Sequence, residues 1–283
     1  MPLTLALFHH FELLEDGQPV HDFRATKAQA LLAYLAVEAN HAHPRAALAT
    51  LLWPDAGETV AHRNLRQAIY TLRQVLGDDA DACLLLTRQS AQLRLGEQQC
   101  PLEVDVARFR AHVRRGELAA AADLYRGELL TGFAADSWAF DEWLTVAREG
   151  LHVMALDVLF RLTDRAHATG DYATAKRYAR RQLALEPWRE EAHRQLMLTL
   201  DANGERSQAL LQYQQCCQVL QAEFGAEPSH ETTTLATRIR AVQERRLQAP
   251  LPAEHPARAP RDRAPAANPA FVGRDAELAR IEA

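Results

Sequence analysis

Residues 58–77 read ETVAHRNLRQAIYTLRQVLG. Apolar side chains recur in this segment at steps of three and four residues, which places them in one stripe along an α-helix. Thr59 suits the N-cap of this helix and Gly77 suits the position just past its end, so both boundaries are encoded locally. The stripe consists of Ala61, Leu65, Ala68, Ile69, Leu72 and Leu76.

The opposite face of this expected helix carries arginines and amides, and no carboxylate occurs from residue 60 to residue 76. Arginine and glutamine can form paired hydrogen bonds with base edges, and arginine also binds phosphate. A solvated face is the alternative, but such faces usually mix acidic with basic side chains. The pattern therefore predicts a DNA-recognition helix with the candidate contacts Arg63, Arg66, Gln67, Tyr70, Thr71, Arg73 and Gln74.

The segments before this helix predict a small sheet and two further helices. Short strands are expected at residues 3–8, 11–14 and 19–23, with a turn at Asp16-Gly17. Thr26-x-x-Gln29 has the form of a capping box that opens a helix ending near Asn40. A second helix is expected from Pro44 to Trp53.

A β-hairpin is expected after the recognition helix, with strands at residues 83–87 and 92–95. Strands, three helices and a hairpin form a winged helix, in which the third helix enters the major groove and the hairpin lies on the neighbouring backbone. Arg88 in the turn of the hairpin is a candidate phosphate contact, or else an exposed turn arginine.

From residue 104 onward the pattern is helical and rich in alanine. Gly170 and Gly204 begin similar segments 34 positions apart, which is the period of tetratricopeptide repeats, and Gly116 begins a looser copy. Each glycine is expected to end a helix. The aromatic cluster at residues 138–144 is interpreted as packing between repeats rather than as a ligand site, and a long helix is expected from residue 144 to 169.

Composition limits the classes of function. The chain has 283 residues and a net charge of −5, so DNA binding must come from a local patch rather than an overall basic charge. No apolar run approaches the ~20 residues needed to span a membrane, so a cytoplasmic protein is expected. The four cysteines lack metal-site or redox spacing and are expected to be reduced thiols. No metal site is expected at His9-His10 or at His41 and His43, and neither a cofactor loop nor a catalytic constellation stands out.

Several short motifs stand out in the two parts of the chain. Those in the winged helix are LLWPD at 51–55, RNLRQA at 63–68 and LRxxLG at 72–77, and those in the helical part are TGF at 131–133, EWL at 142–144 and FGxEPS at 224–229. Together these motifs resemble the SARP-type bacterial transcriptional activators. The resemblance implies a winged helix that reads promoter DNA and helps RNA polymerase engage, followed by a bacterial transcriptional activation domain for protein interaction or dimerisation. By position, residues 63, 66, 67, 70 and 71 would face bases, while 73 and 74 would lie nearer the backbone.

The end of the sequence differs in composition from the rest. Residues 249–270 are rich in proline and alanine, which predicts a linker without a core. Residues 271–278 resemble the entry to the nucleotide-binding domain of signal-transduction ATPases, but no phosphate-binding loop follows, so ATP hydrolysis is not expected. We therefore expect a winged helix-turn-helix domain at 1–100, a tetratricopeptide-like domain at 101–248, a linker at 249–270 and the start of an ATPase domain at 271–283.

The predicted fold class is mainly α with a small β component. The favoured function is a sequence-specific, non-enzymatic transcriptional regulator, more specifically an activator, which binds double-stranded promoter DNA and has RNA polymerase or a second copy of itself as further partners. The competing function is a helical-repeat interaction scaffold whose winged helix does not bind DNA. Salt dependence separates the two, since phosphate contacts make affinity fall steeply with ionic strength.

Overall fold

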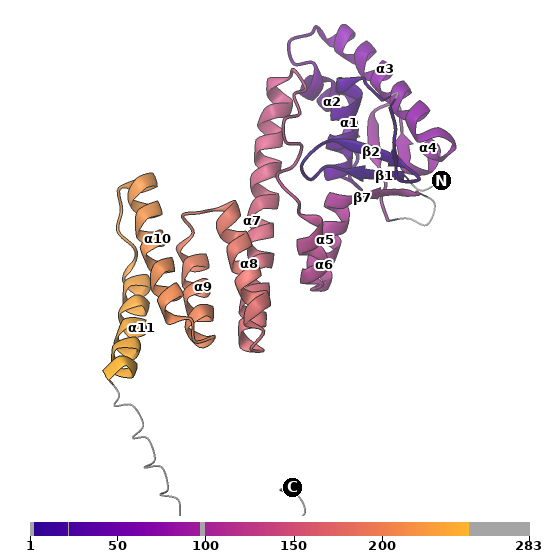
Figure 1. Ribbon diagram of the computed structural model, residues 1–283. Coiled ribbons are helices and arrows are strands. Elements are labelled where there is room, and N and C mark those ends of the chain that lie inside the picture. Colours follow the sequence, from indigo (N-terminus) through magenta and orange to yellow (C-terminus); the bar gives the residue numbers. More distant parts are fainter. Residues whose placement is uncertain (1–2, 22, 97–99, 249–283) are drawn as a thin grey trace, which may run out of the picture. The chain divides into compact units, whose positions relative to one another are not determined.

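The computed structural model describes residues 3–21, 23–96 and 100–248 (Figure 1). It confirms the expected fold class, a winged helix followed by a series of helices, with few strands. The predicted linker at 249–270 and the predicted ATPase start at 271–283 lie outside the described residues. No helix in the described ranges is long and apolar enough to cross a bilayer.

A four-stranded sheet at the N-terminus has the order β3-β2-β1-β7. The Asp16-Gly17 turn joins β2 to β3 as expected, with both residues at positive φ. The first predicted strand is shorter than expected and ends at residue 6. β7 follows the wing in sequence and pairs parallel with β1, so it returns the chain to its starting sheet. The strands are β1 (Leu3–Ala6), β2 (Glu12–Glu15), β3 (Gln18–Pro19) and β7 (Leu102–Val104).

Three helices follow the first three strands: α1 (Thr26–Val37), α2 (Arg45–Leu52) and α3 (Glu58–Leu76). All six residues of the apolar stripe on α3 are buried, as predicted. Two predicted caps are wrong, because each helix begins earlier than expected. Thr26 is the first residue of α1, while Gln29 Nε2 donates to the carbonyl oxygen of Phe23 at 2.6 Å rather than capping the helix. Thr59 lies inside the first turn of α3, which is preceded by Gly57.

The predicted hairpin is present as the wing, formed by β5 (Leu84–Leu86) and β6 (Ser90–Leu93). β6 also pairs with the short β4 (His43–Pro44) before α2, which gives a second sheet of order β4-β6-β5. The turn is one residue tighter than expected, and the Thr87 hydroxyl oxygen accepts hydrogen bonds from the backbone N–H groups of Gln89 and Ser90. A short connection, η1 (Gly77–Asp79) and α4 (Ala80–Cys83), links α3 to the wing.

A disulfide joins Cys83 to Cys100, with a Cα–Cα distance of 4.8 Å. The expectation that all four cysteines are reduced thiols is therefore wrong for this pair. The chain leaves α4 at Cys83, forms the wing and returns towards β7, which brings Cys100 beside Cys83 although 17 positions separate them. Cys216 and Cys217 are free thiols.

The remaining elements are helices, and consecutive ones pack together from α7 to α10. The glycines at 116, 170 and 204 lie just past helix ends with positive φ, as predicted. The long helix begins at Trp138 instead of residue 144, because the Ser137 hydroxyl oxygen accepts from the Phe140 N–H and caps the helix there. The helices are α5 (Asp105–Arg115), α6 (Leu118–Leu124), α7 (Trp138–Ala168), α8 (Tyr172–Leu185), α9 (Glu190–Ala202), α10 (Arg206–Phe224) and α11 (His230–Gln248).

The winged helix and the first helices after it share one hydrophobic core, whose buried residues run from Leu3 to Tyr178. The aromatic cluster at the start of α7 contributes to this core. The Trp143 ring centroid lies 4.8 Å from that of Tyr34 on α1, so Trp143 packs against the winged helix rather than between repeats. Phe140 is fully buried, with its ring next to those of Phe133 and Trp143. Trp138 is 61% exposed, and the packing prediction is wrong for this residue.

Hydrogen bonds reinforce the contact between the winged helix and the helical part. Ser137 Oγ donates to the Leu51 carbonyl oxygen at 2.6 Å. Asp105 Oδ2 accepts from the backbone N–H groups of Leu7 and Phe8, each at 2.9 Å. The described residues up to Ile239 consequently form one compact unit, and displacing α3 relative to α7 would disrupt a continuous core.

Candidate nucleic-acid interface

The exposed face of α3 gathers most of the predicted contact residues. Successive residues of an α-helix are rotated by about 100°, which places Arg63, Arg66, Gln67, Tyr70 and Gln74 on one arc opposite the buried stripe. All five are exposed, and Tyr70 retains 55% of its accessible surface. Burial of the apolar stripe against α1 and α2 thus forces the polar arc of α3 into solvent.

The two arginines at the centre of this arc have no partners in the described part of the chain. Neither Arg63 nor Arg66 forms an ion pair or a side-chain hydrogen bond there. A guanidinium group presents five N–H donors in a planar fork that matches phosphate oxygens and the acceptor edge of guanine. Both groups can therefore bind a polyanion without first breaking a contact within the protein.

Other residues of α3 are already engaged. Gln74 Nε2 donates to the Tyr70 hydroxyl oxygen at 2.7 Å, so these two side chains form one polar unit. Arg73 Nη2 donates to Asp81 Oδ1 on α4 at 2.8 Å. Arg73 is therefore held towards α4 at the end of the helix, and its charge is balanced before any ligand arrives.

Thr71 differs from the other predicted contacts because it is half-buried, with its hydroxyl donating to the Gln67 carbonyl oxygen at 3.1 Å. Thr71 and Gln67 line a hollow of about 220 Å³ between α3, the start of α1 and the Trp53 ring. Thr71 thus lies at the margin of the exposed arc.

Lys27 borders the same hollow, and the sequence reasoning missed it. Its ammonium group donates to the Leu52 carbonyl oxygen at 2.5 Å and to the Asp136 carbonyl oxygen at 3.1 Å, and lies 5.8 Å from the Trp53 ring centroid. Burial lowers the pKa of Lys27, while nearby carboxylates oppose this effect. In the sequence, Lys27 could have been noticed as a single lysine near the start of an otherwise apolar helix. Lys27 joins α1, the end of α2 and the segment before α7.

Arg88 lies in the exposed turn of the wing, as predicted. The neighbouring Gln89 carbonyl oxygen accepts from the Arg45 N–H at 2.8 Å, which ties this turn to the start of α2. The eight predicted contacts thus come from two elements, seven from α3 and one from the wing.

In each of the two histidine pairs weighed as metal ligands, the two rings lie close together. The ring centroids are 3.9 Å apart for His9 and His10 and 5.0 Å apart for His41 and His43. His43 is buried, and its Nε2 bonds to the Glu38 carbonyl oxygen. Among the residues that the structure describes, no group of three or more His, Cys, Asp or Glu side chains could hold a metal ion.

Two family models match the chain. The model of the bacterial transcriptional activator domain matches residues 104–240, from the end of β7 into α11. The model described as "Transcriptional regulatory protein, C terminal" matches residues 24–90, which include α1, α2, α3 and most of the wing. The candidate contacts on α3 and Arg88 lie within this second match.

Similar proteins include the transcriptional regulatory protein MoaR1 of Mycobacterium bovis and that of Mycobacterium tuberculosis. Each is 27% identical over 227 residues, which cover 75% of this chain and 71% of the relative. The solved structure of Mycobacterium tuberculosis EmbR in complex with a low affinity phosphopeptide has the same fold, with a TM-score of 0.69 and 22% identity. The match covers 85% of this chain and 65% of the EmbR chain. The two matched domains, together with the MoaR1 relatives, support the assignment of this chain as a SARP-type transcriptional regulator.

Proposed function

We propose that this regulator activates transcription by binding double-stranded promoter DNA, with α3 in the major groove and the wing on the adjacent backbone. The observation that carries this proposal is the exposed arc of α3, in which Arg63 and Arg66 are without a carboxylate partner in the described ranges. The major groove of B-DNA admits an α-helix and displays a distinct pattern of donors and acceptors for each base pair. A free guanidinium fork on such a helix matches that pattern.

The contacts within the helix suggest a division of roles. Arg63 and Arg66 would bind base edges, with Gln67 beside them. The Tyr70 and Gln74 pair would act as one donor and acceptor unit, since their mutual hydrogen bond fixes both side chains. Arg73, Thr71 at the margin of the arc and Arg88 on the wing would lie nearer the phosphates. Phosphate contacts position a protein on DNA, whereas base contacts give specificity.

The helical part is proposed as the surface for protein partners, namely RNA polymerase or a second copy of the chain. Packed helix pairs form extended surfaces that suit such contacts. Several large apolar side chains of α7 are exposed, including Trp138 at 61%, Val146 at 69% and Val153 at 55%. We propose functional domains at 1–100 and 101–248, even though their hydrophobic core is continuous. The proposed role is regulatory rather than enzymatic, in the cytoplasm.

Selection of bound genomic fragments, followed by fluorescence anisotropy on the selected site, tests the proposal. Replacing both Arg63 and Arg66 with alanine is expected to abolish site preference, because each bidentate contact to guanine contributes about 1–3 kcal/mol of discrimination. Replacing Arg114 and Arg115 with alanine removes the same charge from the exposed end of α5 and is the matched control. This control should retain site preference.

The salt dependence of the same binding distinguishes the competing function. Each phosphate contact contributes about 0.9 to the slope of log affinity against log salt. A steep slope supports DNA binding through several cationic contacts. The proposed interface would be rejected if DNA binding were insensitive to salt, or if the Arg63→Ala/Arg66→Ala double variant kept its preference for the selected site. Either result would favour a winged helix that docks protein.

A further inference from the structure

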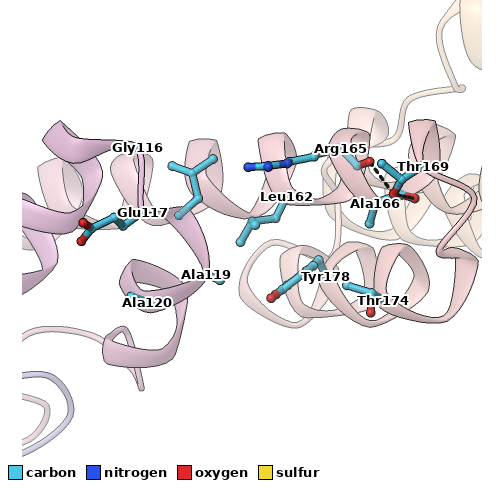
Figure 2. A pocket seen from close by; sticks show the side chains of 11 residues that line it. Gly116, Glu117, Ala119, Ala120, Leu162, Arg165, Ala166, Thr169, Thr174 and Tyr178 are labelled. Atoms are coloured by element: carbon cyan, nitrogen blue, oxygen red, sulfur yellow. Dashed lines mark hydrogen bonds between the residues drawn. The ribbon is translucent and has the colours of Figure 1, made fainter.

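A cavity in the helical part lies far along the chain from the proposed DNA interface. It has a volume of about 550 Å³ and is open to solvent between the α5–α6 turn, the end of α7 and the start of α8 (Figure 2). Cavities of about 300–1,000 Å³ accept small molecules. Its lining residues are Gly116, Glu117, Leu118, Ala119, Ala120, Leu162, Arg165, Ala166, Thr169, Thr174 and Tyr178.

The walls of this cavity are mostly apolar. Leu118 on α6 and Leu162 and Ala166 on α7 are each 7–8% exposed, so each has a small accessible area that faces the cavity. Ala119 and Ala120 on α6 are exposed and short, which leaves the space beside them open. An apolar group placed here would remove apolar surface from water on several sides.

Most polar groups in the lining are already bonded within the protein. Glu117 Oε2 accepts from His112 Nδ1 at 2.5 Å. The Thr169 hydroxyl donates to the carbonyl oxygens of Arg165 and Ala166, both at 3.1 Å. The Thr174 hydroxyl bonds with the Asp171 carboxylate that caps α8. None of these groups needs a ligand.

Two polar groups in the lining of this cavity have no such partner among the described residues. Tyr178 as a residue retains 7% of its accessible surface, and its hydroxyl, which still reaches solvent, forms no hydrogen bond with any described residue. The exposed Arg165 guanidinium likewise has no carboxylate partner among the residues that the structure describes. Figure 2 shows Arg165 extending along α7 beside Leu162, with Tyr178 on the facing helix α8. A cation and a hydroxyl donor thus border the same apolar space.

We propose that this cavity is a binding site for a small organic carboxylate with an apolar body. The Arg165 side chain, which Figure 2 draws on the other side of Leu162 from Tyr178, would turn towards the cavity, and the carboxylate would then accept hydrogen bonds from the Arg165 guanidinium and the Tyr178 hydroxyl. The apolar body would lie against Leu118, Leu162 and Ala166. A planar guanidinium binds a carboxylate through two parallel hydrogen bonds, and charged hydrogen bonds are stronger than neutral ones. An amine would instead meet an unbalanced cation at Arg165, so the site selects the anionic end group.

The location of the cavity connects this ligand to the rest of the molecule. α7 carries the contact of Trp143 with Tyr34 of the winged helix, and α5 begins at Asp105, whose carboxylate accepts from the backbone N–H groups of Leu7 and Phe8 just after β1. A ligand that bridges α6, α7 and α8 would therefore stabilise the helices that support the winged helix. The proposed site does not depend on DNA binding.

Three probes with one apolar body test the site: 3-phenylpropionate, 3-phenylpropanamide and 3-phenylpropylamine. Titration of each into the full chain, followed by ¹H–¹⁵N NMR chemical shifts, measures affinity and location together. The carboxylate is expected to bind at least about tenfold more tightly than the amide or the amine, with the largest shifts at residues 116–120, 162–169 and 174–178.

Variants make the assignment specific. Arg165→Met keeps the apolar stem and is expected to weaken carboxylate binding by about tenfold or more, and Tyr178→Phe by about fivefold. Arg161→Met removes the same charge one turn earlier on α7, outside the lining, and should leave affinity unchanged. Equal affinity for all three probes, or carboxylate binding that survives Arg165→Met, would overturn the proposal even if DNA binding is intact.

Discussion

Replacing Asp81 with asparagine is expected to strengthen DNA binding. Arg73 Nη2 lies 2.8 Å from Asp81 Oδ1, so under the proposed function Arg73 must leave this carboxylate before it can bind a phosphate. The substitution keeps the size of the side chain and removes its charge. It therefore frees Arg73 without altering the buried stripe of α3.

The size of this effect follows from the exposure of the pair. The Arg73 and Asp81 side chains are 49% and 82% exposed, which makes this a surface salt bridge. Such pairs contribute about 0.2–1 kcal/mol, equivalent to an affinity increase of about 1.4- to 5-fold. Fluorescence anisotropy between about 50 and 200 mM salt measures both the affinity and the salt slope.

A double-mutant cycle separates release of Arg73 from a general change in charge. Arg73→Ala alone is expected to weaken binding and to lower the salt slope by about 0.9. Asp81→Asn in the Arg73→Ala background should then give only the small gain from removing a negative charge. If the gain is the same with and without Arg73, or if Arg73→Ala leaves the affinity unchanged, Arg73 does not contact the phosphates as proposed.

Three further expectations concern stability. Glu190→Gln should destabilise the docking of α11: burial by itself raises the pKa of Glu190, but hydrogen bonds from Thr232 and Ser229 outweigh it and hold this pKa below its usual value. In denaturant unfolding, the loss of unfolding free energy should be largest above the ordinary glutamate pKa of about 4.3 and should shrink at lower pH. A difference in unfolding free energy between wild type and variant that does not change with pH would contradict this. Replacing Cys83 and Cys100 with alanine should cost about 3 kcal/mol, as for a loop of similar length, measured by non-reducing thermal unfolding, and an unchanged midpoint would argue against the disulfide. Leu65→Ala, at a buried site on α3, should cost about 2–5 kcal/mol by urea unfolding, and a cost below about 1 kcal/mol would mean that this face is not tightly packed.

Features set by neighbouring residues could be predicted from the sequence. The buried stripe of α3 follows from a 3.6-residue period, and all six of its members are buried. Gly170 and Gly204 lie at positive φ because a helix that ends in this way needs a left-handed residue. The exposed arc of α3 follows from the same period, so the position of the candidate interface was predictable.

Features set by the path of the chain could not be predicted. The Cys83–Cys100 disulfide depends on how the wing returns to the first sheet. The two wrong caps, at Thr26 and Thr59, reflect backbone turns that begin one or more residues earlier. Trp138 and Phe140 are both aromatic, but the phase of α7 exposes one and buries the other.

Within the candidate interface, periodicity could not separate free side chains from engaged ones. Arg66 and Arg73 are both exposed arginines of α3, yet only Arg73 lies next to a carboxylate from the following helix. The hydrogen bond between Gln74 and Tyr70 also depends on rotamers that the sequence does not specify. The structure therefore separates the arginines on the exposed face of α3 into those without a carboxylate partner in the described residues, such as Arg66, and Arg73, which is paired with Asp81.

Methylation interference gives a direct test of whether the exposed face of α3 binds in the major groove. Dimethyl sulfate methylates guanine N7, which lies in the major groove, and adenine N3, which lies in the minor groove. Guanine methylation within the selected site is expected to block binding, and Arg66→Ala is expected to remove this interference at one or more specific guanines. Interference confined to adenines, or a guanine pattern identical in the wild type and in the Arg63→Ala and Arg66→Ala variants, would contradict this expectation.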